Sequence, residues 1–336
     1  MSTTAFGIDL GTSNIRIYNS IDEHILMEKN MIAIENKRTV FAYGDSAYEM
    51  FEKAPGNINI TYPLSNGVIA DIKNMETIIK FFVAGIMKNN IKPADYYIAV
   101  PTDVTEVEKR AFYDLIKESN VKARKIMVVE KAIADGLGMD IDIKNSQGVL
   151  MVDIGFETTE ISILSLGGIV LSRLIKTGGL KFDEAIKSAV RKEFSLFIGG
   201  KTAENVKINL KDLEEKEEPA VVYGRDIVTG LPVERSIPTA IVDKALEEHF
   251  DAIIDNIKVI LERTPPELSA DIFRKGLYLT GGGSMVNKLA EKIANGTGLK
   301  VNIAENPQSS VALGLAKIIN DDNYKSVAYS IEGMGK

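Results

Sequence analysis

The sequence predicts an α/β fold in which two similar domains face a shared cleft. Its 336 residues are too many for one typical domain and suit two. A strand–Asp–x–Gly–turn–strand unit occurs twice, in 5–20 and in 148–175, with Asp9 and Asp153 in the same place. Such internal duplication carries much weight because it decides the fold. Apolar strands alternate with helical segments, which indicates mainly parallel sheets.

The expected elements of the first half are short. The segment AFGIDLGTSNIRIYNS is expected to form two strands joined at GTSN. Buried strands are expected at 96–100 (YYIAV) and 125–129 (KIMVV), and the small residues AIADGLG begin a helix after the second. Apolar residues at every fourth position predict a helix over 105–119. The expected buried stripe of that helix is Val107, Ala111 and Leu115.

The second half contains the clearest expected helix, 242–261, which two consecutive prolines stop. Residues 276–280 are expected to form a strand that leads into three glycines, followed by a helix over 285–294. The charged segment KDLEEKEE, 211–218, is expected to be an exposed loop. The apolar stripe of the expected helix 242–261 comprises Ala245, Leu246, Phe250, Ile253, Ile254, Ile257 and Leu261.

Composition excludes several kinds of site. The chain has no cysteine, which excludes disulfides, thiolate nucleophiles and cysteine metal ligands. His24 and His249 are too few for a histidine metal cluster. The net charge of −7 argues against nucleic acid as a partner. MSTTAFGIDL contains no basic leader and no stretch is long and apolar enough for a membrane span, so we expect a soluble cytoplasmic protein.

The first hairpin carries residue types that bind phosphate and magnesium. Glycine lets the backbone approach an anion, and backbone N–H and hydroxyl groups donate hydrogen bonds to it. Asp9, at the strand end, would hold the water shell of Mg²⁺, which prefers oxygen ligands. Taken alone, DLGTSN favours a plain hairpin turn. The phosphate-binding candidates are Gly11, Thr12, Ser13 and Asn14.

The second hairpin repeats this arrangement with Asp153, Gly155, Thr158 and Thr159. Two aspartates from matched hairpins would face one metal ion, and the pair is much more specific than either member. A third glycine site, GGGS at 281–284, follows a strand. It suits close approach of a base or ribose, or of phosphate at a helix N-terminus. By itself it would be weak evidence, because a tight strand-to-helix turn explains it equally well.

Together, the three motifs resemble the fold of actin, Hsp70 and the sugar kinases. Longer segments narrow the resemblance to the bacterial actin MreB over nearly the whole chain. These segments are VPTDVTEVEKRAF (100–112), GGLKFDEAI (178–186), TAENVKINL (202–210), VTGLPVER (228–235) and LERTPPELSADIFRKGLYLTGGGS (261–284). The last of them is highly specific.

The resemblance implies an actin-like fold with four subdomains around a cleft that binds ATP or ADP with Mg²⁺. It also implies polymerisation into paired filaments beneath the membrane, which guide cell-wall synthesis and set rod shape. Domain I would comprise 1–141 and 320–336, with a small subdomain at 31–65. Domain II would comprise 142–319, with a small subdomain at about 177–243.

Carried over motif by motif, the resemblance also assigns site residues. The phosphate loops would be Asp9, Gly11, Thr12, Ser13 and Asn14, and Asp153, Gly155, Phe156, Glu157, Thr158 and Thr159, with both aspartates holding Mg²⁺ through water. The nucleoside would contact Glu204, Lys207, Gly281, Gly282, Gly283 and Ser284. Glu204 and Lys207 would equally suit an ordinary surface pair one helical turn apart. Ala312 and Gly314 would pack near the hinge.

Two departures from the family pattern concern catalysis. Phe156 and Glu157 replace the last two of three glycines in the second loop. Lys131 stands where the family has the glutamate that orients the attacking water, because EKA replaces Glu-Glu-Pro. A lysine ammonium cannot accept a proton from water. We therefore expect ATP to be bound at Asp153 and hydrolysed slowly or not at all, unless a one-position shift makes Glu130 the catalytic carboxylate.

Glu157 raises a separate problem. A carboxylate ~4 Å from a phosphate charge would repel it by about 4 kcal/mol at an intermediate dielectric. The side chain must turn away from the nucleotide or be neutralised, and Lys131 is a candidate partner.

Other functions of the same fold remain as alternatives. A non-hydrolysing regulatory partner would cap or co-assemble with another MreB. A small-molecule kinase would need a carboxylate base beside a sugar pocket, for which no motif is present. A chaperone ATPase would need a substrate-binding domain, for which 336 residues leave no room.

The resemblance implies filament subunits, other MreB paralogues and membrane-bound cell-wall elongation proteins as partners. A family member can also touch the inner face of the membrane peripherally. Here the expected contact is the loop KNNIKPA, 88–94, with Ile91 as its apolar residue. Full burial of one isoleucine contributes roughly 1.5–3 kcal/mol, which anchors a chain only when many copies act together along a filament.

Overall fold

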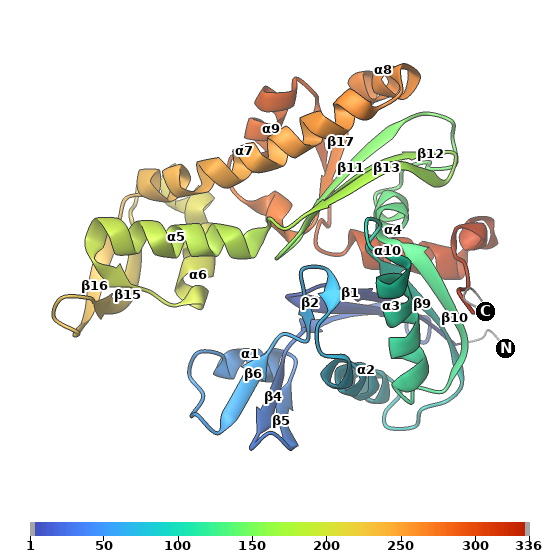
Figure 1. Cartoon of the computed structure of the whole chain (residues 1–336), viewed down its shortest axis with the longest axis horizontal. Coiled ribbons are helices and arrows are strands. Elements are labelled where there is room, and N and C mark those ends of the chain that lie inside the picture. The colour runs from blue at the N-terminus through green and yellow to red at the C-terminus, as the bar shows by residue number, and fades with distance from the viewer. Residues whose placement is uncertain (1–3, 333–336) are drawn as a thin grey trace.

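The computed structural model describes residues 4–332; residues 1–3 and 333–336 of the predicted first domain lie outside the described residues. Two five-stranded sheets dominate the α/β fold (Figure 1). Their strand orders are β10-β9-β1-β2-β3 and β18-β17-β11-β12-β13. In each sheet the first hairpin strand pairs antiparallel with its partner and parallel with the strand on its other side. The predicted duplication is therefore confirmed as two sheets of one topology. The expectation of mainly parallel sheets is wrong, because two of the four strand pairings in each sheet are antiparallel.

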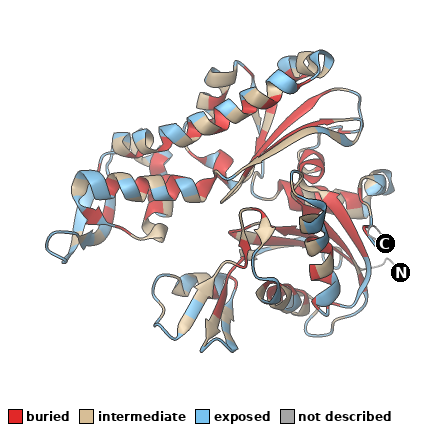
Figure 2. Ribbon diagram, viewed as in Figure 1, coloured by how far each residue is buried: buried red, intermediate tan, exposed pale blue. Residues whose placement is uncertain are grey.

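The strands of the first sheet are β1 (Ala5–Leu10), β2 (Asn14–Asn19), β3 (His24–Lys29), β9 (Ala94–Val100) and β10 (Ala123–Glu130). Those of the second are β11 (Val149–Ile154), β12 (Thr159–Ser165), β13 (Gly168–Ile175), β17 (Leu277–Thr280) and β18 (Val301–Ile303). Nearly all residues of β1, β2, β11 and β12 are buried (Figure 2). The strands of both hairpins are thus anchored in the hydrophobic cores, and this burial fixes the position of the turn at the end of each hairpin.

Two helices hold the sheets together. Helix α10 (Ser310–Asn320) packs on β1, and α4 (Lys131–Gly138) packs on β10 and β11. The helices cross so closely that a Cβ added to Gly314 would lie 1.8 Å from the carbonyl oxygen of Ala134. The crossing therefore requires a residue without a side chain at position 314.

A small lobe extends from each sheet, and both lie on the same side of the molecule (Figure 1). The first consists of β4 (Ile32–Glu35), β5 (Thr39–Tyr43), α1 (Asp45–Met50) and β6 (Ile58–Thr61). The second consists of α5 (Gly179–Phe194), β14 (Leu196–Phe197), α6 (Gly200–Glu215), β15 (Ala220–Asp226) and β16 (Pro232–Ile237). We call them the α1 lobe and the α6 lobe.

The remaining elements connect or flank the sheets and lobes. They are β7 (Leu64–Ser65), β8 (Val68–Ile69), α2 (Ile72–Ile86), α3 (Glu106–Glu118), α7 (Thr239–Arg263), α8 (Pro266–Lys275), η1 (Gly282–Met285), α9 (Leu289–Thr297) and η2 (Asp322–Val327). Among the described residues, no helix combines the length and apolarity that crossing a membrane requires. The predicted domain limits fall in the loop between α4 and β11 and at the end of α10, and they stay predictions.

Three expectations about helices are wrong. Helix α3 exists, but Val107 is 79% exposed, and its buried face is Phe112, Tyr113, Leu115 and Ile116. Fourfold spacing identified the helix but not its inward face, which packing against β9 and β10 decides.

The charged segment 211–218 is not a loop throughout, because α6 continues to Glu215. In this helix Leu210 is buried and Glu214 forms an ion pair with Lys288. These tertiary contacts stabilise the helix and could not be predicted from its charged sequence. The third error concerns 285–294. A 3₁₀ turn, η1, begins within the three glycines at Gly282, and α9 begins only at Leu289.

Candidate functional site

A cleft lies between the two hairpins and under the lobes, with about 1180 Å³ of empty space out to its mouth. The predicted site residues that line it are Asp9, Gly11, Thr12, Ser13, Asn14, Lys131, Asp153, Gly155, Phe156, Thr158, Glu204, Lys207, Gly281, Gly282 and Gly283. The predicted residues Glu130, Glu157, Thr159 and Ser284 are not part of that lining.

The two turns have matching geometry. The Gly11 N–H donates to the carbonyl oxygen of Asn14 at 3.0 Å, and the Gly155 N–H donates to that of Thr158 at 2.8 Å. Each turn therefore presents the same backbone face to the cleft. Thr159 differs from the prediction, because its Oγ1 donates to the Thr177 carbonyl at 2.7 Å.

The third glycine site closes against the second hairpin. Gly281 has φ +82°, and a Cβ there would lie 2.1 Å from Asp153 Oδ1. Glycine is therefore required both for the backbone conformation and for the close approach. Ser284 turns back and donates from Oγ to the Gly281 carbonyl at 2.7 Å, so it supports the turn from behind.

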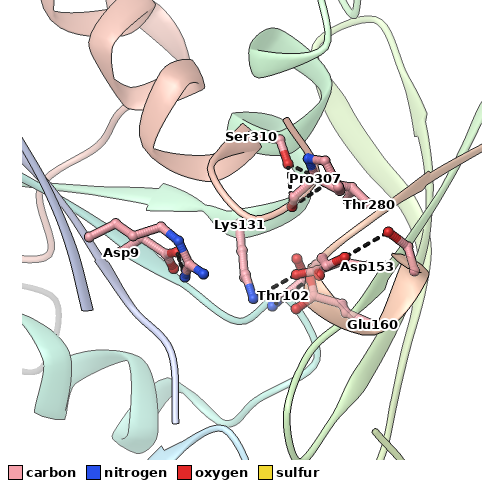
Figure 3. A network of polar contacts seen from close by, with 11 residues as sticks. Asp9, Thr102, Lys131, Asp153, Glu160, Thr280, Pro307 and Ser310 are labelled. Carbon is pink, nitrogen blue, oxygen red and sulfur yellow. Dashed lines mark hydrogen bonds and ion pairs between the residues drawn. The ribbon is translucent and has the colours of Figure 1, made fainter. Parts of the chain in front are cut away.

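Lys131 is the central cation of the cleft. It begins α4, and its Nζ lies 2.6 Å from Asp153 Oδ2 (Figure 3). Burial by itself would lower the pKa of the ammonium, but the neighbouring carboxylates, Asp153 first, raise it above its ordinary value. Lys131 therefore stays charged. The suggestion that it neutralises Glu157 is wrong, because its partner is Asp153.

Arg16 holds the other predicted metal-binding aspartate. It lies opposite Asp9 in the β1–β2 pair, and its Nη1 is 3.3 Å from Asp9 Oδ2. Both side chains are buried and line the cleft. The equivalent position in the second hairpin, opposite Asp153, is Glu160. Arg16 was not predicted as a site residue from the sequence, although a charged residue inside an apolar strand indicates a special role.

Two further buried carboxylates were missed. Asp135 and Glu160 line the cleft. Burial raises the pKa of Asp135 well above its usual range, and the Asp153 carboxylate raises it further. Burial also raises the pKa of Glu160, to about 7, against the opposing effect of Lys131. Asp135 follows Lys131 by one helical turn, so its acidic side chain in the apolar helix AIADGLG was the available clue.

Glu130 and Glu157 bind groups outside the cleft lining. Glu130 Oε1 accepts hydrogen bonds from Lys109 Nζ at 2.8 Å and from the Tyr329 hydroxyl at 2.7 Å. Glu157 Oε2 accepts from the Asn66 N–H at 2.5 Å. The carboxylate of Glu157 has therefore turned away, which removes the predicted repulsion of a bound phosphate.

Glu204 and Lys207 are not an ordinary surface pair. Glu204 Oε2 accepts a hydrogen bond from the Tyr48 hydroxyl of the α1 lobe at 2.6 Å. Lys207 Nζ lies 2.7 Å from Asp183 Oδ1 and is buried with it. Burial raises the pKa of Asp183 to about 6, an effect that Lys207 opposes. Glu204 and Lys207, which belong to α6, both line the cleft.

The carboxylates do not fit a magnesium ion held between the two hairpins. Mg²⁺ requires an octahedral shell of oxygens and keeps several waters, which must hydrogen-bond to free carboxylate oxygens. Asp9 and Asp153 each have one oxygen in an ion pair with a fixed cation. Among residues 4–332, no group of three or more His, Cys, Asp or Glu side chains is arranged to hold a metal ion.

Comparison with known proteins places this geometry in a family. The model of the MreB/Mbl protein family matches residues 3–326. The cell shape-determining protein Mbl of Bacillus subtilis is 37% identical over 319 residues, which cover 94% of this chain and 95% of that protein. The cell shape-determining protein MreB of Escherichia coli is 34% identical over 330 residues, covering 95% and 94%.

Solved structures agree with this. MreB5 of Spiroplasma citri bound to ADP superposes with a TM-score of 0.88 at 33% identity, covering 97% of this chain and 98% of that one. The same protein bound to AMPPNP gives a TM-score of 0.89. A chain of the MamK double helical filament, 23% identical with a TM-score of 0.77, shares the fold. The fold is actin-like, and the chain belongs to the MreB/Mbl family.

Proposed function

We propose that this chain is an ATP-binding actin-like protein that polymerises into filaments and helps to set cell shape by organising cell-wall synthesis. The observation that carries the proposal is the pair of matched hairpins facing one cleft in a chain of the MreB/Mbl family. Relatives that cover nearly the whole chain are named cell shape-determining proteins, and a 33% identical MreB5 binds ADP and AMPPNP.

We further propose that hydrolysis of ATP is slow or absent. Lys131 occupies the position of the expected water-orienting carboxylate and is bound to Asp153. Glu130, the alternative carboxylate, is held by Lys109 and Tyr329. Orientation of an attacking water requires an acceptor within hydrogen-bond reach, which an ammonium cannot provide.

The test is polymerisation followed by light scattering and electron microscopy with ATP, ADP or no nucleotide, together with phosphate release. We expect filaments of the single protein with ATP and phosphate release at least about tenfold slower than that of an ordinary family member assayed beside it. Filaments that form only with a second MreB would favour a regulatory, co-assembling subunit instead. Phosphate release at the ordinary family rate would refute impaired hydrolysis.

A repair variant sharpens this test. Lys131→Glu returns a carboxylate to the cleft, and we expect it to raise phosphate release by about tenfold or more, within the usual range for general-base catalysis. Lys288→Glu is a matched control, because Lys288 also pairs with carboxylates, Glu214 and Asp243, but lies outside the cleft lining. It should leave phosphate release unchanged.

Partners beyond the filament itself follow from the same proposal. We infer that other MreB paralogues and membrane-bound cell-wall elongation proteins are partners, with the filament at the inner face of the membrane. The loop 88–94 contributes little alone, because Ile91 is half-buried and its carbonyl accepts from Lys122 Nζ at 2.9 Å. Co-sedimentation of preformed filaments with liposomes distinguishes direct contact from contact through partners.

A further inference from the structure

We propose that Lys131 and Arg16 take the place of the divalent cation in the cleft, so that the nucleotide is bound without Mg²⁺. This inference rests on the proposed nucleotide binding and deepens it. The structure supplies two independent observations, one on each hairpin. They concern the two aspartates that the hairpins bring to the cleft.

The first observation is the position of the Lys131 ammonium. Its Nζ lies 2.6 Å from Asp153 Oδ2, so it occupies the space beside this carboxylate that the water shell of Mg²⁺ would need. Asp9 adds to the negative field around it. A divalent ion could reach Asp153 only by displacing a charged lysine from a set of carboxylates that hold it.

The second observation is the state of Arg16. The guanidinium is always charged, and it binds Asp9 at 3.3 Å where both side chains are buried. Its Nε, also buried, has no hydrogen-bond partner among the described residues. Arg16 lines the cleft, so its positive charge lies at the wall of the space that the phosphates would occupy.

Charge balance links the two observations. Nucleotide phosphates in solution are partly neutralised by bound Mg²⁺. In this cleft two fixed cations cancel the charge of Asp9 and Asp153 before any ligand arrives. A metal-free nucleotide therefore meets a site whose hairpin carboxylates are already neutralised. A hydrated Mg²⁺ brought with the phosphates would instead lie next to the Lys131 ammonium, which repels it.

The decisive experiment is equilibrium binding of a fluorescent ADP and a fluorescent ATP to the full chain, in excess Mg²⁺ and in excess EDTA. We expect the Kd in EDTA to be equal to that in Mg²⁺ within about threefold, or lower, because Mg²⁺ competes with the protein for free nucleotide. A Kd in EDTA more than about threefold higher would overturn the inference. Absence of binding in both conditions would refute the proposed nucleotide function itself, so the two failures are distinguishable.

Variants of Lys131 test whether its charge is what makes nucleotide binding independent of Mg²⁺. Lys131→Met removes the charge with little change in size and frees Asp153. We expect its binding to become dependent on Mg²⁺ by about tenfold or more. Lys131→Arg keeps a cation and should stay independent of the metal. Lys288→Met, outside the cleft lining, is the matched control and should behave as wild type. Metal-independent binding by a folded Lys131→Met, checked by thermal unfolding, would overturn the role of Lys131.

A direct count of metal completes the test and does not depend on a variant. Mn²⁺ serves as a paramagnetic probe, titrated into protein that is in excess over ADP. We expect the wild-type complex to take up no Mn²⁺ with the bound ADP, and Lys131→Met to take up one ion. One Mn²⁺ per bound ADP in the wild type would overturn the inference.

Discussion

Glu160 is a buried carboxylic acid whose surroundings oppose its charge. It is buried on β12, where Lys131 and Asp153 are the charged groups that act on it most strongly, and its Oε1 accepts from the Thr102 N–H at 3.1 Å. Burial raises its pKa from 4.5 to about 7. A raised pKa means that the folded state binds the proton more tightly than the unfolded state. The contribution to stability is therefore complete below pH 4.5 and is lost as the pH rises through 7.

Glu160→Gln tests this at the residue scale. The amide keeps an oxygen for Thr102 but does not titrate, so the variant should lack the loss of stability between pH 4.5 and 7. We expect the free energy of unfolding of the variant, relative to wild type, to rise by up to about 3 kcal/mol between pH 5 and pH 8. Urea unfolding at both pH values measures it. An equal difference at the two pH values would contradict the assigned pKa.

At the scale of elements, helix α3 shows how a local signal stabilises a correctly predicted element. Thr105 and Glu108 form a reciprocal capping box, in which Glu108 Oε2 accepts from the Thr105 N–H at 2.7 Å. Thr105 Oγ1 in turn accepts from the Glu108 N–H at 3.2 Å. These bonds satisfy backbone donors that the first turn of a helix leaves free.

Thr105→Ala should therefore destabilise the protein by about 1 kcal/mol. Thr77→Ala is the matched control, because Thr77 lies within α2 and its Oγ1 donates to the Lys73 carbonyl four residues earlier. It should change the free energy of unfolding by less than about 0.5 kcal/mol. Chemical unfolding of the three proteins side by side measures both effects, and equal stability losses would argue against the capping box.

At the scale of the whole molecule, the two lobes are joined over the cleft. The Tyr48 hydroxyl donates to Glu204, Lys201 Nζ donates to the Tyr48 carbonyl, and the Gly200 N–H donates to Glu52. Deeper in, the ring of Phe156 lies 5.8 Å from that of Tyr62. The two residues that replace glycines thus bridge the halves, since Glu157 also binds Asn66. We predict that the proposed nucleotide leaves only after these contacts open.

Tyr48→Phe tests this closure. Burial and the Glu204 carboxylate raise the pKa of Tyr48, so its hydroxyl stays protonated and donates. Loss of about 1 kcal/mol of hydrogen bonding should speed dissociation of a fluorescent ADP roughly fivefold. Tyr43→Phe, a change in the same lobe at a ring that packs on Phe81, is the control and should leave the rate unchanged. Stopped-flow displacement by unlabelled ADP gives both rates.

The sequence by itself determined the duplicated hairpins, the strands that carry them and the glycine-rich turn at 281–283, because these depend on residue spacing and on local backbone sterics. Through the resemblance to MreB, it also identified Lys131, Phe156 and Glu157 as departures from the family pattern. Only the tertiary structure decided which carboxylate Lys131 binds, where Glu130 and Glu157 turn, and which face of α3 is buried. Long side chains choose partners among groups that the fold brings together from distant parts of the chain. Arg16, Asp135 and Glu160 line the cleft for the same reason. These charged side chains are buried close to other charged groups only after the two halves of the chain have packed together.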